Sequence, residues 1–139
     1  TEAEWEYMAR AGTTTDYTTG NTITPEHANY NGDPHGVQKD ENLNRNKTMP
    51  VGSFPPNKFG IFDVEGNVRE YTQDCWHDDF VGAPTDGTAW IEDGNCNKRV
   101  AKSGAWGGTK DEMRTSSRGW LEVTRTSVSY GFRIARSIE

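Results

Sequence analysis

Long apolar runs are missing from this 139-residue sequence, and its apolar fraction is only 32%. No stretch approaches the roughly 20 apolar residues that a transmembrane helix needs, so we expect no membrane span. Leucine, isoleucine and valine are scarce, whereas 15 glycines and 5 tryptophans are present. This composition argues against a bundle of long helices. It favours one irregular, loop-rich domain that is pinned by large aromatic side chains.

An excess of positive charge is also missing, because the formal net charge is −6 at pH 7. Proteins that bind nucleic acids usually present a basic surface, so we expect no nucleic-acid partner. The sequence contains no nucleophile elbow, Walker-type phosphate loop, dinucleotide-binding fingerprint or HExxH zinc motif. The residues by themselves therefore indicate a small α+β domain and no particular reaction.

Cysteine is limited to Cys75 and Cys96, which could be two free thiols, a disulfide or half of a metal site. His27, His35 and His77 show no zinc-ligand spacing, which weakens the metal interpretation. Both cysteines lie in polar, loop-like sequence, where an unpaired thiol would be exposed, so we favour the disulfide. It would close a loop of about 20 residues and contribute about 3 kcal/mol. It would also favour an oxidising compartment, outside the cytoplasm or at the cell surface.

The strongest helix signal lies at the start of the sequence. Thr1 and Glu4 have the spacing of a capping box, and apolar residues recur at helical intervals from Trp5 onward. We therefore predict a short helix over about residues 2–11, which Gly12 would end.

The remaining local signals are weaker. A hairpin or loop is predicted for residues 13–24, and a long polar loop for residues 31–47. Short runs with strand character give the predicted strands 99–106, 113–118 and 131–136. Residues 51–57 are predicted to form a short strand that enters an extended polyproline segment.

The stretch from Phe59 to Cys75 carries the clearest candidate site. Asp63 and Glu70 provide hard oxygen donors on either side of a glycine-containing turn. Such donors suit Ca²⁺, which accepts six to eight oxygen ligands in irregular geometry. A surface turn with two solvated carboxylates is the alternative. The spacing is not that of an EF-hand loop.

Five motifs occur in a familiar order: TEAEWEYMARAG, HANY, PVGSFPPNKFGIFDVEGNVREY, RVAKSGAW and GFRIA. Together they resemble the formylglycine-generating enzyme (sulfatase-modifying factor) family. The resemblance implies a C-type-lectin-like α+β fold with a small twisted antiparallel sheet, short helices, much irregular structure and stabilising Ca²⁺. It also implies that residues 1–139 form a single domain of this type without its N-terminal part.

The resemblance assigns two calcium sites by position. In the first, Asp63 and Glu70 would supply side chains, and the carbonyl donors would come from Glu65, Gly66 and Val68. In the second, Asn29 and the Tyr30 carbonyl would bind the ion together with Asn42 or Asn44, which lie in the loop before Pro50.

One departure from the family concerns catalysis. Enzymatic members oxidise a cysteine of a sulfatase to formylglycine with a copper-binding cysteine pair. The matching segment, residues 103–113, contains no cysteine, and thiolate is the ligand that selects Cu(I). We therefore expect neither copper nor this oxidation. The alternatives are an oxidoreductase of this type that acts on protein cysteine, or an oxidase that uses other residues.

The C-terminal part also resembles the non-catalytic variable proteins of diversity-generating retroelements, in which positions between scaffold residues form a binding surface. This implies a ligand-binding module whose contact surface lies in residues 107–130 and whose partner is a protein or other surface ligand. The predicted contact residues are Gly107, Gly108, Lys110, Asp111, Glu112, Trp120, Leu121, Glu122, Ser127, Ser129 and Tyr130. A core position for Trp120 is the alternative.

Overall fold

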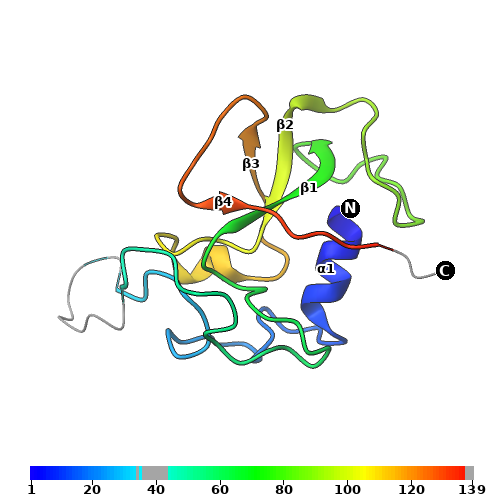
Figure 1. Ribbon diagram of the computed structural model, residues 1–139. Helices are drawn as coiled ribbons and strands as arrows, with labels where there is room; N and C mark the ends of the chain where they lie inside the picture. The colour runs from blue at the N-terminus through cyan, green and yellow to red at the C-terminus, as the bar shows by residue number, and fades with distance from the viewer. Residues whose placement is uncertain (34, 36–43, 137–139) are drawn as a thin grey trace.

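The computed structural model describes residues 1–33, 35 and 44–136, and it combines one small sheet with much irregular chain. Its elements are α1 (Glu2–Arg10), β1 (Arg69–Trp76), β2 (Asn95–Lys102), the 3-10 helix η1 (Lys110–Met113), β3 (Gly119–Glu122) and β4 (Tyr130–Gly131). In Figure 1 the sheet forms the upper part of the molecule, and the irregular segments lie mainly below it. No helix in the described ranges has the length and apolar character required to cross a bilayer.

The four strands are ordered β3-β2-β1-β4. β1 pairs with β2, and β2 with β3, in the antiparallel sense, whereas β4 runs parallel to β1. The sheet is therefore mixed: its antiparallel pairs agree with the predicted antiparallel sheet, and the parallel pair of β1 and β4 was not predicted. The reason is the connection after β3, which carries the chain to the opposite edge of the sheet and returns it in the direction of β1 (Figure 1).

The predicted N-terminal helix is confirmed. The Thr1 hydroxyl accepts a hydrogen bond from the Glu4 amide at 3.1 Å, and the Glu4 carboxylate accepts one from the Thr1 amino group at 2.8 Å. The helix ends at Arg10, one residue before the predicted limit. Ala11 takes the left-handed conformation with a φ of 45°, and Gly12 follows with 83°.

The strand predictions were less accurate. β2 begins four residues before the predicted start at residue 99, residues 51–57 form no strand, and β4 is confined to Tyr130–Gly131. Residues 113–118 contain the end of η1 and a turn, and strand β3 begins only at Gly119. Short strands form because they pair with segments that are distant in the sequence. The local hydrophobic pattern does not predict that pairing. The predicted hairpin or loop of residues 13–24 contains a bridge between Tyr17 and Gly20.

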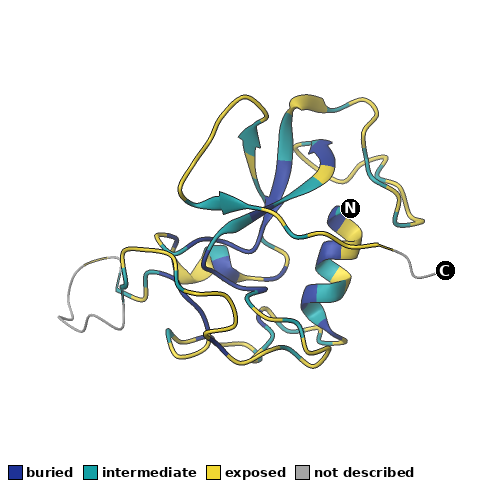
Figure 2. Cartoon of the chain, viewed as in Figure 1, coloured by how far each residue is buried: buried dark blue, intermediate teal, exposed yellow. Residues whose placement is uncertain are grey.

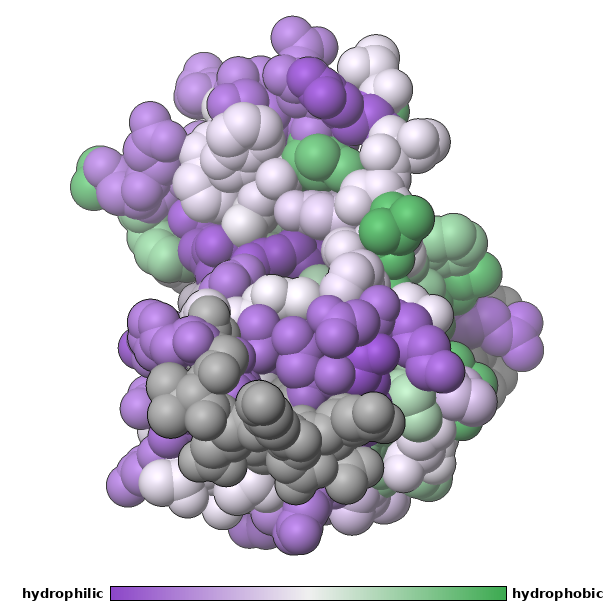
Figure 3. Space-filling view, turned by 90° about the vertical axis from the view of Figure 1, so that its left-hand side faces the viewer, coloured by the Kyte–Doolittle hydropathy of each residue, from purple (hydrophilic) through white to green (hydrophobic). Residues whose placement is uncertain are grey.

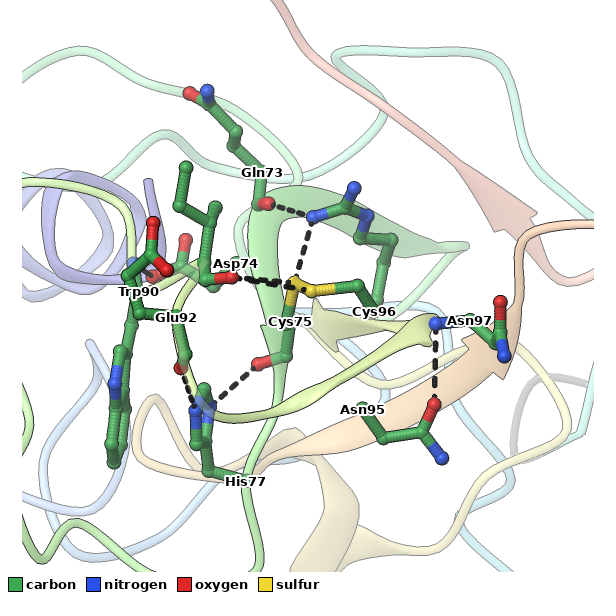
Figure 4. The surroundings of a disulfide bond; sticks show 11 residues. Gln73, Asp74, Cys75, His77, Trp90, Glu92, Asn95, Cys96 and Asn97 are labelled. Atoms are coloured by element: carbon green, nitrogen blue, oxygen red, sulfur yellow. Dashed lines mark hydrogen bonds between the residues drawn. A yellow bond between two sulfur atoms is a disulfide. The ribbon is translucent and has the colours of Figure 1, made fainter.

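The predicted disulfide is confirmed: Cys75 and Cys96 are bonded, and their Cα atoms are 4.5 Å apart. The bond joins the end of β1 to the start of β2 and closes the irregular segment between them (Figure 4). The Cys75 side also contacts the Arg99 guanidinium, whose Nη1 lies 3.2 Å from its sulfur.

Among the described residues, hydrophobic side chains form two small buried clusters, and further buried residues line β1, β2 and one side of α1 (Figure 2). One cluster is built from Tyr17, Ile23, Ala28, Tyr30 and Met113, and the other from Trp5, Ala9 and Val64. Trp5 alone of the five tryptophans is buried, so large aromatics do pin the domain, but most of the indole rings reach the surface.

A lysine is buried where α1 meets the sheet. Lys102 has no exposed side-chain surface, and its Nζ lies 3.0 Å from a Glu6 carboxylate oxygen and 3.8 Å from one of Glu2. Burial would raise the pKa of the Glu6 carboxyl, but the charges of Lys102 and Arg10 hold that pKa below its usual value. This ion cluster anchors the helix to β2.

Candidate functional site

The predicted calcium stretch ties separate loops together through its carboxylates. Asp63, which has a φ of 55°, accepts a hydrogen bond from the Gly52 amide at 2.7 Å. Glu65 accepts two hydrogen bonds from Thr18, one from the amide and one from the hydroxyl, each at 2.7 Å. Burial raises the pKa of the Glu65 carboxyl, and the two Thr18 hydrogen bonds oppose that rise. Both carboxylates therefore connect separate backbone segments, and that of Glu65 is buried.

Glu70 is buried on β1 and already holds a cation of the protein. Its carboxylate forms an ion pair with the Arg133 guanidinium and accepts a hydrogen bond from the Trp5 indole nitrogen at 2.6 Å. Arg133 also donates to the carbonyls of Phe62 and Asp63. The guanidinium thus occupies the carboxylate that was expected to bind calcium, and a calcium ion there would compete with it.

A second feature lies where Asn29 meets Gly66. The two residues form a parallel bridge, and a Cβ at position 66 would lie 2.4 Å from the Asn29 carbonyl oxygen, so this approach requires glycine. The Asn29 side chain is fully buried, and its Nδ2 donates to the Lys47 carbonyl at 2.9 Å and to Asn67 Oδ1 at 3.1 Å. Its Oδ1 has no partner among the described residues. A buried amide oxygen without a donor is the kind of ligand that a cation would use.

The other residues predicted for this second site are less informative. Tyr30 is buried next to Asn29, and its hydroxyl donates to the Ile23 carbonyl. Asn44 accepts a hydrogen bond from the Asn46 amide at 3.2 Å, and Asn42 lies outside the described residues. No group of three or more histidine, cysteine, aspartate or glutamate side chains in the described ranges is arranged to hold a metal. A cation at Asn29 would therefore depend on amide and carbonyl oxygens.

The predicted contact surface divides into two parts, of which the first surrounds η1. Gly107 is exposed, whereas Gly108 is buried and its carbonyl accepts a hydrogen bond from the Asn31 amide at 2.9 Å. Glu112 pairs with the partly buried Arg69 and caps the start of η1. The side chains of Lys110 and Asp111 are exposed. Asp111 also pairs with the exposed Arg114 at 3.6 Å, and the Lys110 ammonium lies 5.8 Å from the Tyr17 ring centroid.

The second part follows β3, an edge strand. Trp120 is 39% exposed, so the core alternative does not hold. The Trp120 ring centroid lies 6.5 Å from that of Trp76. The Lys98 ammonium lies 3.3 Å from the Trp120 ring centroid. Leu121 and Glu122 are half-buried.

The connection from β3 to β4 supplies the remaining predicted contacts. Ser127 is exposed, and its hydroxyl accepts a hydrogen bond from the Ser129 amide at 3.2 Å. The Tyr130 hydroxyl donates to the Trp120 carbonyl at 3.4 Å, and its ring lies 5.5 Å from that of Tyr71. Trp120 and Tyr130, which come from the two opposite edge strands, are thus directly connected.

Trp76 and Lys98 were not predicted to belong to this surface. They reach Trp120 because β3 pairs with β2, and that pairing places Glu122 opposite Lys98. No residue spacing in the sequence predicts this pairing register. In Figure 3, hydrophilic and intermediate residues make up most of the face on the left-hand side of Figure 1, and hydrophobic residues are few. A ligand on this face would meet mostly polar groups.

The mixed four-stranded sheet, its single described α-helix and its long irregular segments define a C-type-lectin-like domain of the formylglycine-generating-enzyme type. Residues 1–138 match the family model of the Sulfatase-modifying factor enzyme 1-like domain. The chain therefore belongs to this family.

Two solved structures share the fold. PvdO from Pseudomonas aeruginosa superimposes with a TM-score of 0.79 and 37% sequence identity, over 95% of this chain and 49% of that chain. Variable protein 1 from Treponema denticola gives a TM-score of 0.70 and 27% identity, over 95% of this chain and 44% of that chain. The predicted similarity to both the sulfatase-modifying family and a variable protein is thus confirmed.

Curated relatives extend well beyond this chain. The serine/threonine-protein kinase pkn1 of Chlamydia pneumoniae is 31% identical over 99% of the chain, which spans only 20% of that protein. The formylglycine-generating enzyme of Mycobacterium tuberculosis is 45% identical over 52% of the chain and 25% of that enzyme. The chain therefore corresponds to about a fifth or a quarter of the length of these relatives.

Proposed function

We propose that this domain is a non-catalytic ligand-binding module whose contact surface lies in residues 107–130. The observation that carries the proposal is the partly exposed Trp120 on the edge strand, where Trp76 and Lys98 contact its ring. Aromatic side chains of this kind, surrounded by adaptable polar residues, dominate the binding energy of many protein interfaces. The partner would be a protein or another surface ligand.

The scaffold beneath this surface is firmly held. Arg69 fixes Glu112, and Asn31 fixes the Gly108 carbonyl. These contacts hold the chain around η1 while the side chains of Lys110 and Asp111 reach solvent. A rigid frame that presents exposed polar groups lowers the entropic cost of binding a partner.

The cysteine chemistry supports the absence of formylglycine formation. Both cysteines of the chain are joined in one disulfide, so neither offers a thiolate while that bond is intact. Cu(I) is held by soft thiolate ligands, and the segment that follows β2 contains none. The alternative, an oxidoreductase that acts on protein cysteine, would need ligands from elsewhere in the protein.

Calcium is the structural ion of this proposal. The best support lies at Asn29, whose buried Oδ1 has no donor among the described residues. Bound Ca²⁺ would satisfy this oxygen together with nearby carbonyls such as that of Tyr30. At the first predicted site, Glu65, Gly66 and Val68 would contribute carbonyls, but Arg133 competes for the Glu70 carboxylate.

Two experiments test the proposal. Calorimetric titration of the chelator-treated protein with CaCl₂ should show binding, and bound Ca²⁺ should raise the melting temperature. Asn29→Ala should abolish both effects. Binding heat of the same size in Asn29→Ala would overturn the Asn29 assignment.

Copper loading followed by incubation with a sulfatase-motif peptide should produce no aldehyde, as measured by mass spectrometry. Oxidation of the peptide would overturn the non-catalytic module.

A further inference from the structure

Three of the five tryptophans meet around one open hollow, which we name the tryptophan hollow. Its volume is about 540 Å³, within the range of small-ligand sites. The hollow is lined by Trp76, His77, Asp78, Asp79, Val81, Trp90, Asp93, Gly94, Asn95, Lys98 and Trp120. Most of these residues come from the segment that the disulfide closes, and none except Trp120 was predicted to bind a ligand.

The walls of the tryptophan hollow are held in place by close packing. The His77 ring stacks on Trp90 with centroids 3.5 Å apart and an interplanar angle of 6°. The two His77 ring nitrogens lie 3.1 Å from the Cys75 carbonyl and 2.8 Å from the Glu92 carbonyl (Figure 4). A Cβ on Gly94 would lie 2.3 Å from this ring, so only glycine lets the chain pass so closely. The hollow is therefore formed before any ligand arrives.

Charge at the rim points to the chemistry of the ligand. Three exposed aspartates, Asp78, Asp79 and Asp93, line the hollow together with a single lysine, Lys98. Trp76 Nε1 donates to Asp78 at 2.8 Å, which fixes the ring and the carboxylate relative to each other. Indole faces attract cations, and a surplus of carboxylates strengthens that attraction.

The protein itself shows that indole faces at the hollow accept cations, and Arg118 already lies 4.8 Å from the Trp76 ring centroid. The Lys98 ammonium lies 3.3 Å from the Trp120 ring centroid, in the position of a cation–π contact. Lys98 is only half-buried and extends from β2, so its long side chain can leave this position when another cation arrives. It would then act as a built-in competitor for the Trp120 face.

We propose that the tryptophan hollow binds an arginine or lysine side chain of a partner protein. The inference deepens and rests on the proposed binding module, because Trp120 belongs to both surfaces. The guest cation would lie against the Trp120 face in place of Lys98, and it would pair with the rim carboxylates, because Trp76 and Trp90 already stack on Arg118 and His77.

Tryptophan fluorescence of the calcium-loaded protein provides the primary measurement. The protein should be titrated with a capped hexapeptide of arginine. A second titration uses the matched citrulline hexapeptide, which has the same shape but no charge. We expect the arginine peptide to bind at least fivefold more tightly, with an affinity that falls as salt is raised. Equal binding of the two peptides, or no binding of the arginine peptide, would overturn the proposal.

Variants at exposed positions locate the binding without threatening the fold. Asp93→Asn should weaken the arginine peptide about threefold, which is the effect of one surface ion pair. Asp86→Asn is the matched control, since Asp86 is exposed, lies outside the lining and should change nothing. Loss of affinity in Asp86→Asn equal to that in Asp93→Asn would contradict the placement.

The sign of the Lys98→Gln effect is the sharpest test. Removal of the competing ammonium should strengthen binding of the arginine peptide about threefold, whereas a site built for an anion would lose affinity. Methyl glycosides titrated in parallel test a neutral sugar as the guest. Saturable quenching by a glycoside that is insensitive to Lys98→Gln would overturn the cationic ligand.

Different results would overturn the non-catalytic module and the cationic guest of the tryptophan hollow. Aldehyde formation on a sulfatase-motif peptide would overturn the non-catalytic module and would leave the fluorescence titrations interpretable. Equal binding of the arginine and citrulline peptides would overturn the cationic guest and would leave the non-catalytic module in place.

Discussion

The sheet and the irregular half of the molecule are stabilised in different ways. In the sheet, backbone groups of β1, β2 and β3 pair with one another, and a disulfide joins two strand ends. In the described part of residues 11–68, single polar side chains connect several backbone segments. Each of these side chains replaces a set of ladder hydrogen bonds, so a single substitution should be more damaging there than in a strand.

Two asparagines illustrate this arrangement. The Asn67 side chain accepts hydrogen bonds from the Met49 amide and Asn29 Nδ2 and donates to the Met49 carbonyl. The Asn57 side chain donates to the carbonyls at the end of α1 and accepts from two amides of the following turn. Each amide satisfies donors and acceptors at once, which a carboxylate or an alkyl side chain cannot do.

The largest effect is expected for Asn67→Ala. The substitution leaves the Met49 amide and carbonyl without a partner and removes one of the two hydrogen bonds of Asn29 Nδ2, at a buried position with a φ of 64°. At about 1–3 kcal/mol for each unsatisfied group, we expect a loss of about 4 kcal/mol in the free energy of unfolding, measured by urea denaturation. Asn67→Asp keeps the acceptor oxygen and should lower the free energy of unfolding by less. Equal losses in the two variants would show that the acceptor contributes nothing.

Removal of the disulfide should rank second. The double variant Cys75→Ala/Cys96→Ala opens a loop with a sequence separation of 21. We expect a loss of about 3 kcal/mol in the free energy of unfolding. The reduced wild-type protein is the control and should show a similar loss. An unchanged urea midpoint in the double variant would contradict a stabilising role for the bond.

Asn57→Ala should have a smaller effect, because its surroundings are partly exposed. We expect a loss of about 2 kcal/mol, and Asn57→Asp should retain the hydrogen bonds from Phe59 and Ile61 and lose about half as much. Thermal unfolding followed by circular dichroism measures both. If the two variants were equally unstable, the contacts to the helix end would be the whole effect.

The smallest effect concerns pH and two carboxyl groups with opposite shifts. Burial raises the pKa of Glu65 above its ordinary value of 4.5, so the native state binds the proton more tightly than the unfolded state. Stability should therefore fall as pH rises from about that value through the native pKa, and Glu65→Gln should remove this fall. Urea denaturation between pH 4 and 7 measures it.

Glu6 is the matched control, because its pKa is lowered in the native state. Burial acts against that change, but Lys102 and Arg10 outweigh it. Its contribution to stability is present above an ordinary value of 4.5 and is lost as pH falls through the native pKa. Glu6→Gln should therefore reduce the loss in free energy of unfolding that the wild-type protein shows as pH falls. The same slope change in both variants would contradict the opposite shifts.

Local chemistry accounts for the elements that the sequence predicted well. The capping box of Thr1 and Glu4 acts within one turn, and the bridge between Cys75 and Cys96 was favoured by their polar surroundings. The family motifs then supplied the fold class. Each of these signals is contained in a short segment of chain.

Long-range pairing accounts for what the sequence did not reveal. The ion pair of Glu70 and Arg133 exists because β4 lies parallel to β1, with Glu70 opposite Gly131. Trp120 likewise meets Trp76 only through the register of β3 on β2. A strand of two or four residues has too little periodicity to fix such a register in advance.

The buried Lys102 has a practical consequence for covalent labelling. Its side chain has no exposed surface, so amine-reactive reagents should label the exposed lysines of the native protein and leave position 102 unmodified. Labelling at Lys102 would then report the fraction of molecules in which α1 has separated from the sheet. Mass spectrometry of the labelled peptides could follow that opening in a mixture, even inside a much larger protein.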